Sequence, residues 1–148
     1  DAYLPSTYID DQRQKIEIYK RIKELDSRVN YEELQSELID RFGEYPDAVA
    51  YLLEIGLLKS FLDQAFAKSV EKKQNQLIVT FEAMAGQYFL TQDYFQALSA
   101  TNLKARISEN AGQMQVIFDV RHQKDFEILE QLMIFSEQLA AKKLEKSQ

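Results

Sequence analysis

The hydrophobic periodicity of the chain changes near residue 66. Before that point apolar residues recur every three or four positions, which is typical of amphipathic helices. Beyond it, the runs LIVTFE (77–82) and MQVIFDV (114–120) are rich in β-branched and aromatic residues, which is typical of strands. Helices followed by strands and further helices indicate an α+β fold. We therefore expect one domain over residues 1–148, mainly helical over 1–66 and hairpin-helix-hairpin-helix over 67–144.

Three helices are expected in the first part. Residues 13–25 carry an apolar face formed by Ile18, Ile22 and Leu25, with Tyr19 beside it. In the second helix Asn30 is the expected N-cap, with Glu33 closing a capping box. The hydrophobic staple of that helix would be formed by Val29 and Leu34, and its apolar stripe by Leu34, Leu38 and Phe42.

Glycine and proline mark the next boundaries. Gly43 is expected to end the second helix because glycine adopts positive φ at little cost. Pro46 is expected to be the first residue of a third helix, 46–66, since that position needs no N–H donor. This helix is apolar around most of its circumference, which predicts burial on several sides. Gly56 within it predicts close approach by another element, because glycine there costs about 1 kcal/mol relative to alanine.

The second part is expected to contain two hairpins, each followed by a helix. Each strand-like run has a possible partner upstream across a turn. The paired segments are 68–72 with 77–82 and 103–107 with 114–120, and the helices are 93–100 and 125–144. The apolar face of the last helix is expected to include Phe126, Leu129, Leu132, Met133 and Leu139. N-terminal helices would therefore pack with two β-hairpins and a long C-terminal helix.

The charge is unevenly distributed. The chain has a formal net charge of −6, and residues 1–58 alone contain 13 acids against 7 bases. Nucleic-acid binders carry clustered lysine and arginine that contact phosphates, and the acidic balance of this region is the opposite of that pattern. An acidic surface instead suits a basic protein partner. No apolar run reaches the length of a membrane span. The absence of cysteine is consistent with a cytoplasmic location.

Signals for catalysis are sparse. His122 is the only histidine, and a surface position at a strand-to-helix turn explains it better than a role as ligand or base. The carboxylates Glu37, Asp40, Glu44 and Asp47 would stand on an exposed helix end and a turn, whereas acid–base chemistry needs a dry pocket. We expect no catalytic residue, no metal site and no cofactor. An enzyme built on these carboxylates is the less favoured alternative.

The end of the second helix admits two interpretations. Glu37 and Arg41 form a favourable i, i+4 pair, but Asp40 has no partner in that scheme and lies near the partially negative end of the helix. Alternatively, the three charges form a stripe presented to a partner that carries arginines. The residues alone do not decide between these. The tyrosines of the first third similarly suit either a helical core or an interface; they are Tyr3, Tyr8, Tyr19, Tyr31, Tyr45 and Tyr51.

Two blocks of sequence carry a resemblance to a known family. DAYLPSTYIDDQRQKIEIYKRI (1–22) and SELIDRFGEYPDAV (36–49) resemble the C-terminal domain of the bacterial transcription-repair coupling factors, the Mfd family. The match is dense over residues 1–58; beyond residue 60 only the element order and the closing helix are similar.

The resemblance implies a regulatory domain of a larger ATP-dependent DNA translocase, which removes stalled RNA polymerase and recruits the repair protein UvrA. The start at Asp1 without methionine likewise favours a piece of a longer polypeptide. By this resemblance the domain is no enzyme, and it docks on the UvrB-like N-terminal module of its parent and covers the UvrA-binding surface.

The family's docking helix ends in EL-x-DRFG, which corresponds to Glu37, Asp40 and Arg41. Glu44, Tyr45 and Asp47 would lie at the periphery of that interface. The domain would contact DNA and RNA polymerase only through its parent. Two alternatives remain open: a module that recruits a partner through the acidic helix end, and a domain that only stabilises its neighbour.

Overall fold

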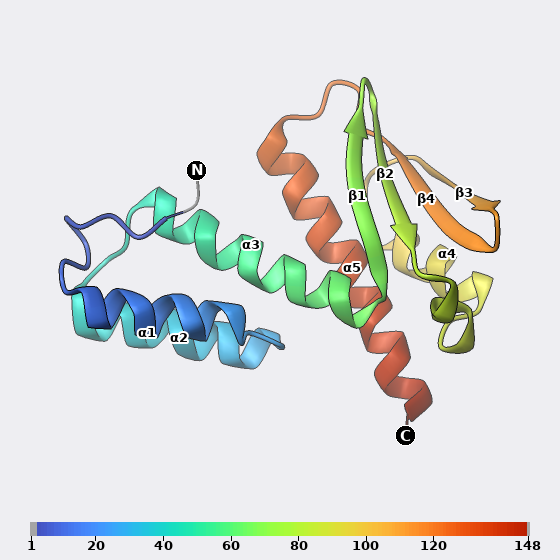
Figure 1. Cartoon of the computed structure of the whole chain (residues 1–148). Helices are drawn as coiled ribbons and strands as arrows, with labels where there is room; N and C mark the ends of the chain where they lie inside the picture. The colour runs from blue at the N-terminus through green and yellow to red at the C-terminus, as the bar shows by residue number, and fades with distance from the viewer. Residues whose placement is uncertain (1–2, 148) are drawn as a thin grey trace. The chain divides into compact units, whose positions relative to one another are not determined.

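The computed structural model describes residues 3–147, with side chains described up to residue 143. The chain divides into two compact units, residues 1–60 and 61–148. The first is helical and contains α1 (Gln12–Lys23), α2 (Arg28–Phe42) and most of α3 (Asp47–Gln64) (Figure 1). The expected three helices are thus confirmed.

The core of the helical unit is formed by aliphatic residues at helical spacing. Ile18 and Ile22 of α1 are buried together with Leu25, as the periodicity predicted. Leu34 and Leu38 of α2 are also buried, whereas Phe42 at the end of their stripe is only half-buried. The helices therefore owe their stability chiefly to the apolar faces that they share, since isolated helices of this length are marginal.

The start of α2 differs from the expectation. Its N-cap is Ser27, whose hydroxyl accepts a hydrogen bond from the backbone N–H of Asn30 at 3.2 Å. The Asn30 side chain in turn accepts from the backbone N–H of Ser27. Asn30 thus fills the third position of the capping box, which was expected to be Glu33, and the helix begins earlier. The predicted staple was wrong as well, because Val29 is 67% exposed.

The end of α2 was predicted correctly, and the start of α3 shifts by one residue. Gly43 has φ +85° and its N–H donates to the carbonyl of Ile39. Pro46 precedes the first helical residue, Asp47, and its carbonyl accepts from the N–H groups of Val49 and Ala50. Pro46 thus still opens the helix. At this position the residue contributes only its carbonyl oxygen to the hydrogen bonds of the helix, so the missing N–H of proline has no cost.

Gly56 allows α1 and α3 to pack closely. A β-carbon built at this position would lie 2.6 Å from Cγ2 of Ile22 and 3.2 Å from the Ile22 carbonyl oxygen. Both distances are too short for a side chain to fit without movement. The predicted close approach is confirmed, and Ile22 is the residue that requires it.

The second unit is a four-stranded antiparallel sheet with helices. Its elements follow the expected hairpin-helix-hairpin-helix order, with strand order β1-β2-β4-β3, and the predicted α+β class is confirmed. The elements are β1 (Ala67–Lys73), β2 (Gln76–Phe81), the 3-10 helix η1 (Ala83–Gln87), α4 (Thr91–Ser99), β3 (Ala105–Asn110), β4 (Gln113–Asp119) and α5 (Asp125–Ser147).

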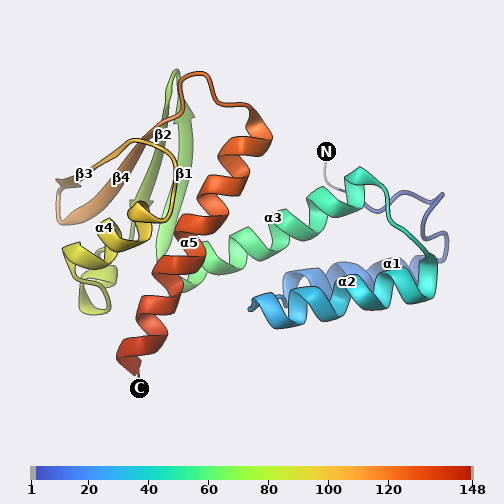
Figure 2. The ribbon, with the colours of Figure 1, turned by 180° about the vertical axis from the view of Figure 1, so that it is seen from behind.

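Both helices of this unit lie on one face of the sheet, as the opposite views in Figures 1 and 2 show. Aromatic side chains fill the space between these layers. The ring of Phe135 on α5 makes edge contacts with Phe81 and Phe118, and Tyr94 on α4 contacts Phe81. Burial raises the pKa of Tyr94 to about 12. The other face of the sheet is left without a helix from this unit.

One predicted core residue of α5 is wrong. Phe126 is 64% exposed, and Ile128 is buried instead. The face of α5 that meets the sheet runs through Ile128, Leu132 and Phe135, with Leu139 one turn further on. Phe126 lies two positions before Ile128, which places it roughly 200° around the helix from that face.

Candidate protein interface

The carboxyl end of α2 carries the charges that the sequence singled out. Asp40, Glu44 and Asp47 are exposed, and the side chains of Glu37 and Arg41 are about one-third exposed at 34% and 30%. Tyr45 is half-buried and its hydroxyl accepts a hydrogen bond from the Gln35 amide at 2.9 Å. The structure therefore places all six candidate residues at or beside one helix end.

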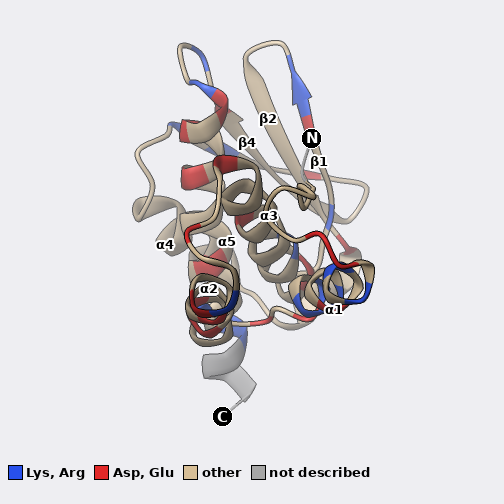
Figure 3. Cartoon of the chain, turned by 90° about the vertical axis from the view of Figure 1, so that its left-hand side faces the viewer, with Lys and Arg blue, Asp and Glu red and all other residues tan. Residues whose placement is uncertain are grey.

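Two of these charges belong to a four-residue ion-pair cluster that joins α1 to α2. Nη1 of Arg41 lies 2.7 Å from Oε2 of Glu37, which confirms the predicted i, i+4 pair. The Arg41 guanidinium also bonds both carboxylate oxygens of Glu17 on α1, at 3.0 and 3.3 Å. Arg21, also on α1, reaches Oε2 of Glu37 at 2.6 Å. Figure 3 shows both signs of charge on these two helices.

The cluster changes the acidity of its members. Hydrogen bonds from Arg21 and then Arg41 hold the pKa of Glu37 below its ordinary value of 4.5. A hydrogen bond from Arg41 likewise lowers the pKa of Glu17, and its two carboxylate partners raise the pKa of Arg41. All four groups remain in contact with solvent, so their Coulomb attraction is screened and each pair contributes little to stability. The cluster serves mainly to fix the orientation of Glu37 and Arg41.

Asp40 differs from its two neighbours. Its side chain is exposed, and it forms no ion pair or hydrogen bond with any other side chain in residues 3–143. An exposed carboxylate at the negative end of a helix gains nothing from the helix dipole. Within the described part of the chain, the local pairing that accounts for Glu37 and Arg41 leaves Asp40 unexplained, as the sequence had indicated.

The segment before α1 is fastened onto this helix end. The Tyr8 hydroxyl lies 2.7 Å from the Gly43 carbonyl oxygen and 3.1 Å from that of Leu38, and its ring contacts Phe42. Burial is the main cause of the raised pKa of Tyr8. Of the other tyrosines, Tyr31 is buried and Tyr19 accepts from the Leu4 N–H. Most of this tyrosine group therefore holds the helical unit together, while Tyr3 and Tyr51 are exposed.

Sequence reasoning missed Glu17 and Arg21. These residues are themselves spaced i, i+4 on α1, the pattern that drew attention to Glu37 and Arg41 on α2. The signal for a charged surface strip on α1 was therefore present in the sequence. That the two strips meet depends on how α1 packs against α2, which periodicity does not specify.

The remaining candidates for chemistry stay apart. His122 is exposed in the turn between β4 and α5 with φ +67°, as expected of a surface turn residue. Within residues 3–143 no three histidine, aspartate or glutamate side chains are grouped so that they could hold a metal ion. The helices of the same range include none long and apolar enough to cross a membrane.

Comparison with known proteins assigns the family. A sequence model of the TRCF domain matches residues 1–91, which is more than half of the chain. The chain belongs to the TRCF domain family. Its fold agrees with this: a crystal structure of the C-terminal domain of a transcription-repair coupling factor is 64% identical with a TM-score of 0.89. That match covers 99% of this chain and 91% of the other.

Curated relatives of this TRCF domain are much longer proteins. The transcription-repair-coupling factor of Bacillus subtilis is 35% identical over 96 residues, which cover 65% of this chain and 8% of that protein. The factor of Staphylococcus haemolyticus is 29% identical over 116 residues, covering 78% of this chain and 10% of the relative. The chain thus spans about a tenth of these relatives. Identity reaches 46% over 59 residues with the Staphylococcus aureus factor.

Proposed function

We propose that this chain is a non-catalytic regulatory domain of a transcription-repair coupling factor, which restrains its parent by docking on the parent's UvrB-like module. In the docked state it covers the surface that UvrA binds. The parent would be a cytoplasmic, ATP-dependent DNA translocase that removes stalled RNA polymerase in transcription-coupled repair. RNA polymerase and DNA would meet this domain only through the parent.

The observation that carries the proposal is the exposed carboxyl end of α2. Glu37 and Arg41 are oriented there by the ion-pair cluster, and Asp40 stands beside them with no side-chain partner among the described residues. Such a preorganised charged surface suits arginines and carboxylates on another module. Glu44, Tyr45 and Asp47 would form its periphery. A polar interface of moderate size also suits a clamp that must be released.

Tethering makes a weak interface sufficient. Two modules of one chain meet at an effective concentration on the order of millimolar, so an affinity too weak for separate proteins can still keep the clamp closed. UvrA binding and domain docking then oppose each other, because both need the same surface and each must weaken the other by the same factor.

The test is titration calorimetry of this chain against the separately expressed UvrB-like module of its parent. Asp40→Arg is the sharpest variant, because Asp40 can be reversed without breaking the cluster, whereas Glu37→Arg also removes the partner of Arg21 and Arg41. The double variant Glu37→Arg/Asp40→Arg is measured beside it. The matched control is Glu32→Arg/Glu33→Arg, which makes the same change of charge at the exposed start of α2.

We expect both Asp40 variants to weaken binding by about tenfold or more, the typical effect of repulsion across an interface, and the control to change it far less. UvrA should displace the native chain. Deleting the domain from the full parent should raise UvrA binding; a fall would instead favour a recruitment module. An affinity that stays the same in both Asp40 variants would contradict a docking surface at the end of α2.

A further inference from the structure

The face of the sheet opposite α4 and α5 carries a second charged site, far from α2 in the sequence. In the strand register Arg106 on β3 lies beside Ile117 on β4, which lies beside Ile78 on β2. The neighbours of Ile117 along the strand, Val116 and Phe118, are buried on the face that α4 and α5 cover. Because side chains alternate along a strand, the Arg106–Ile117–Ile78 row faces the other way.

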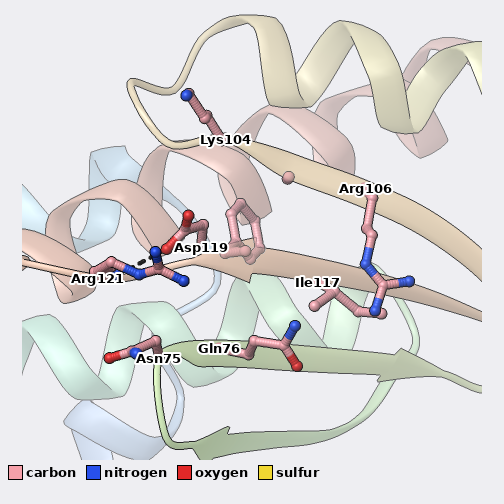
Figure 4. A pocket seen from close by; sticks show the side chains of 9 residues that line it. Asn75, Gln76, Lys104, Arg106, Ile117, Asp119 and Arg121 are labelled. Carbon is pink, nitrogen blue, oxygen red and sulfur yellow. Dashed lines mark hydrogen bonds between the residues drawn. The ribbon is translucent and has the colours of Figure 1, made fainter.

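At one end of this face lies a hollow of about 310 Å³, which we call the basic hollow. Polar residues from three segments surround its apolar floor at Ile117 (Figure 4). They are Asn75, Gln76, Lys104, Arg106, Asp119 and Arg121. Backbone hydrogen bonds fasten the segments together: the N–H of Asp119 donates to the Lys104 carbonyl, and that of Val120 to the Asn75 carbonyl. The hollow is therefore built into the sheet.

The cations of the basic hollow are available to a ligand. No ion pair joins Lys104, Arg106 or Arg121 to another of the side chains described, those of residues 3–143, in contrast to Arg21 and Arg41 of the helical unit. The carboxylate of Asp119 accepts from the backbone N–H of Arg121 at 3.0 Å and leaves the guanidinium free. An unpaired guanidinium fork matches the two oxygens of a carboxylate or phosphate.

The arrangement favours carboxylates over nucleic acid. Figure 4 places Arg106 and Arg121 at opposite ends of the hollow, with Gln76 and Ile117 between them, so their donors do not converge on one phosphate. Single strands bind proteins largely by stacking on aromatic rings. Phe118 borders the hollow, but it is 1% exposed and its ring packs against Phe135 in the core.

An extended acidic peptide fits these features. Alternate residues of an extended chain present their side chains on one face, about 6.8 Å apart. Two such carboxylates can reach toward both ends of the hollow while the peptide lies over its floor at Ile117, which is 8% exposed. The side-chain amides of Asn75 and Gln76 supply donors and acceptors for peptide groups. We propose that the basic hollow binds an acidic segment of another protein, in extended conformation with carboxylates at alternate positions.

The proposal is tested with the whole chain and a fluorescein-labelled octapeptide that alternates glutamate and threonine. Binding is followed by fluorescence anisotropy, and an octapeptide with glutamine in place of glutamate is the control ligand. The variant Arg106→Gln/Arg121→Gln removes two cations from the hollow. The matched control Lys68→Gln/Lys124→Gln removes two exposed cations elsewhere in the same unit. Thermal unfolding of both variants verifies that they fold.

We expect the native chain to bind the glutamate peptide about tenfold more tightly than the glutamine peptide, as charge-assisted hydrogen bonds require. The double variant should lose that preference, and the lysine variant should keep it. The proposal is overturned if the native chain shows no preference, or if the double variant retains it. It is also overturned if a single-stranded DNA dodecamer binds the hollow more tightly than the peptide. Sedimentation that showed Arg106-dependent self-association would assign the hollow to a second copy of the chain instead.

Discussion

At position 56 a single hydrogen atom in place of a side chain sets the spacing of two helices. The β-carbon of any other residue would overlap Ile22, whose branched side chain stands close to its own backbone and whose carbonyl oxygen is also near. Neither atom belongs to the far end of a flexible side chain that could swing away. Relief therefore requires α1 and α3 to move apart, with loss of packing along their shared apolar face.

Gly56→Ala should accordingly destabilise the chain by about 1–3 kcal/mol, the usual cost of overpacking, although alanine is the better helix former. Urea denaturation followed by circular dichroism measures this. Gly86→Ala is the control, because a β-carbon there meets nothing within 4 Å; we expect it to change stability by no more than about 0.5 kcal/mol. Equal stability of the two variants would mean that α1 and α3 tolerate a wider separation.

At the scale of the secondary-structure elements, the ion-pair cluster between α1 and α2 makes a contribution to stability that depends on pH. Glu17 and Glu37 both have a pKa below the ordinary 4.5 in the folded chain. A carboxyl group whose pKa is lower in the folded state contributes its full stabilisation at pH values above its pKa in the unfolded chain. That stabilisation is lost as the pH falls through its pKa in the folded chain. The cluster should therefore stabilise the contact between α1 and α2 slightly at neutral pH, and this contribution should be lost in acid.

Glu17→Gln/Glu37→Gln should thus be less stable than the native chain at about pH 7, and the difference should shrink as the pH falls below about 4.5. Urea denaturation midpoints across that range give the measurement. The control Glu32→Gln/Glu33→Gln removes two exposed charges at the other end of α2 and should not reproduce the pH-dependent gap. A gap that stays constant or widens in acid would show that the two glutamates act through packing and not through charge.

At the scale of the whole molecule the chain consists of two compact units with separate cores. Leu38 is fully buried among the helices of the first, and Phe135 is fully buried between helices and sheet in the second. Only α3 runs through the boundary, ending at Gln64. Because each unit has its own core, a substitution that weakens one core should speed local unfolding in that unit more than in the other.

Phe135→Ala should destabilise the sheet unit by about 3–5 kcal/mol, because it leaves a cavity next to Phe81 and Phe118. Hydrogen exchange followed by mass spectrometry should show faster exchange in residues 67–119 and nearly unchanged exchange in 28–42. Leu38→Ala is the reciprocal variant and should reverse the pattern. Equal acceleration of both ranges in both variants would indicate that the chain unfolds as one cooperative unit.

Much of this fold could be read from local sequence. Helices and strands appeared where the hydrophobic period indicated them, and Gly43 and Gly56 had the roles that their positions suggested. The errors were also local in origin. Ser27 and Asn30 formed a capping box where Asn30 and Glu33 were expected, because asparagine can fill either position of that motif. Phe126 was predicted to lie on the buried face of α5 but is exposed. Apolar residues surround much of that helix, so periodicity alone did not define its buried face.

Periodicity, turn residues and charge spacing by themselves determined the element types, their order and the pairing of Glu37 with Arg41, because these depend on neighbours within a few residues. Only the tertiary structure decided which elements meet. It brought Glu17 and Arg21 of α1 into the α2 cluster, paired β2 with β4, and assembled the basic hollow from residues 75 to 121. Such contacts depend on how whole apolar faces pack, and residues distant in the sequence become neighbours only when those faces are buried together.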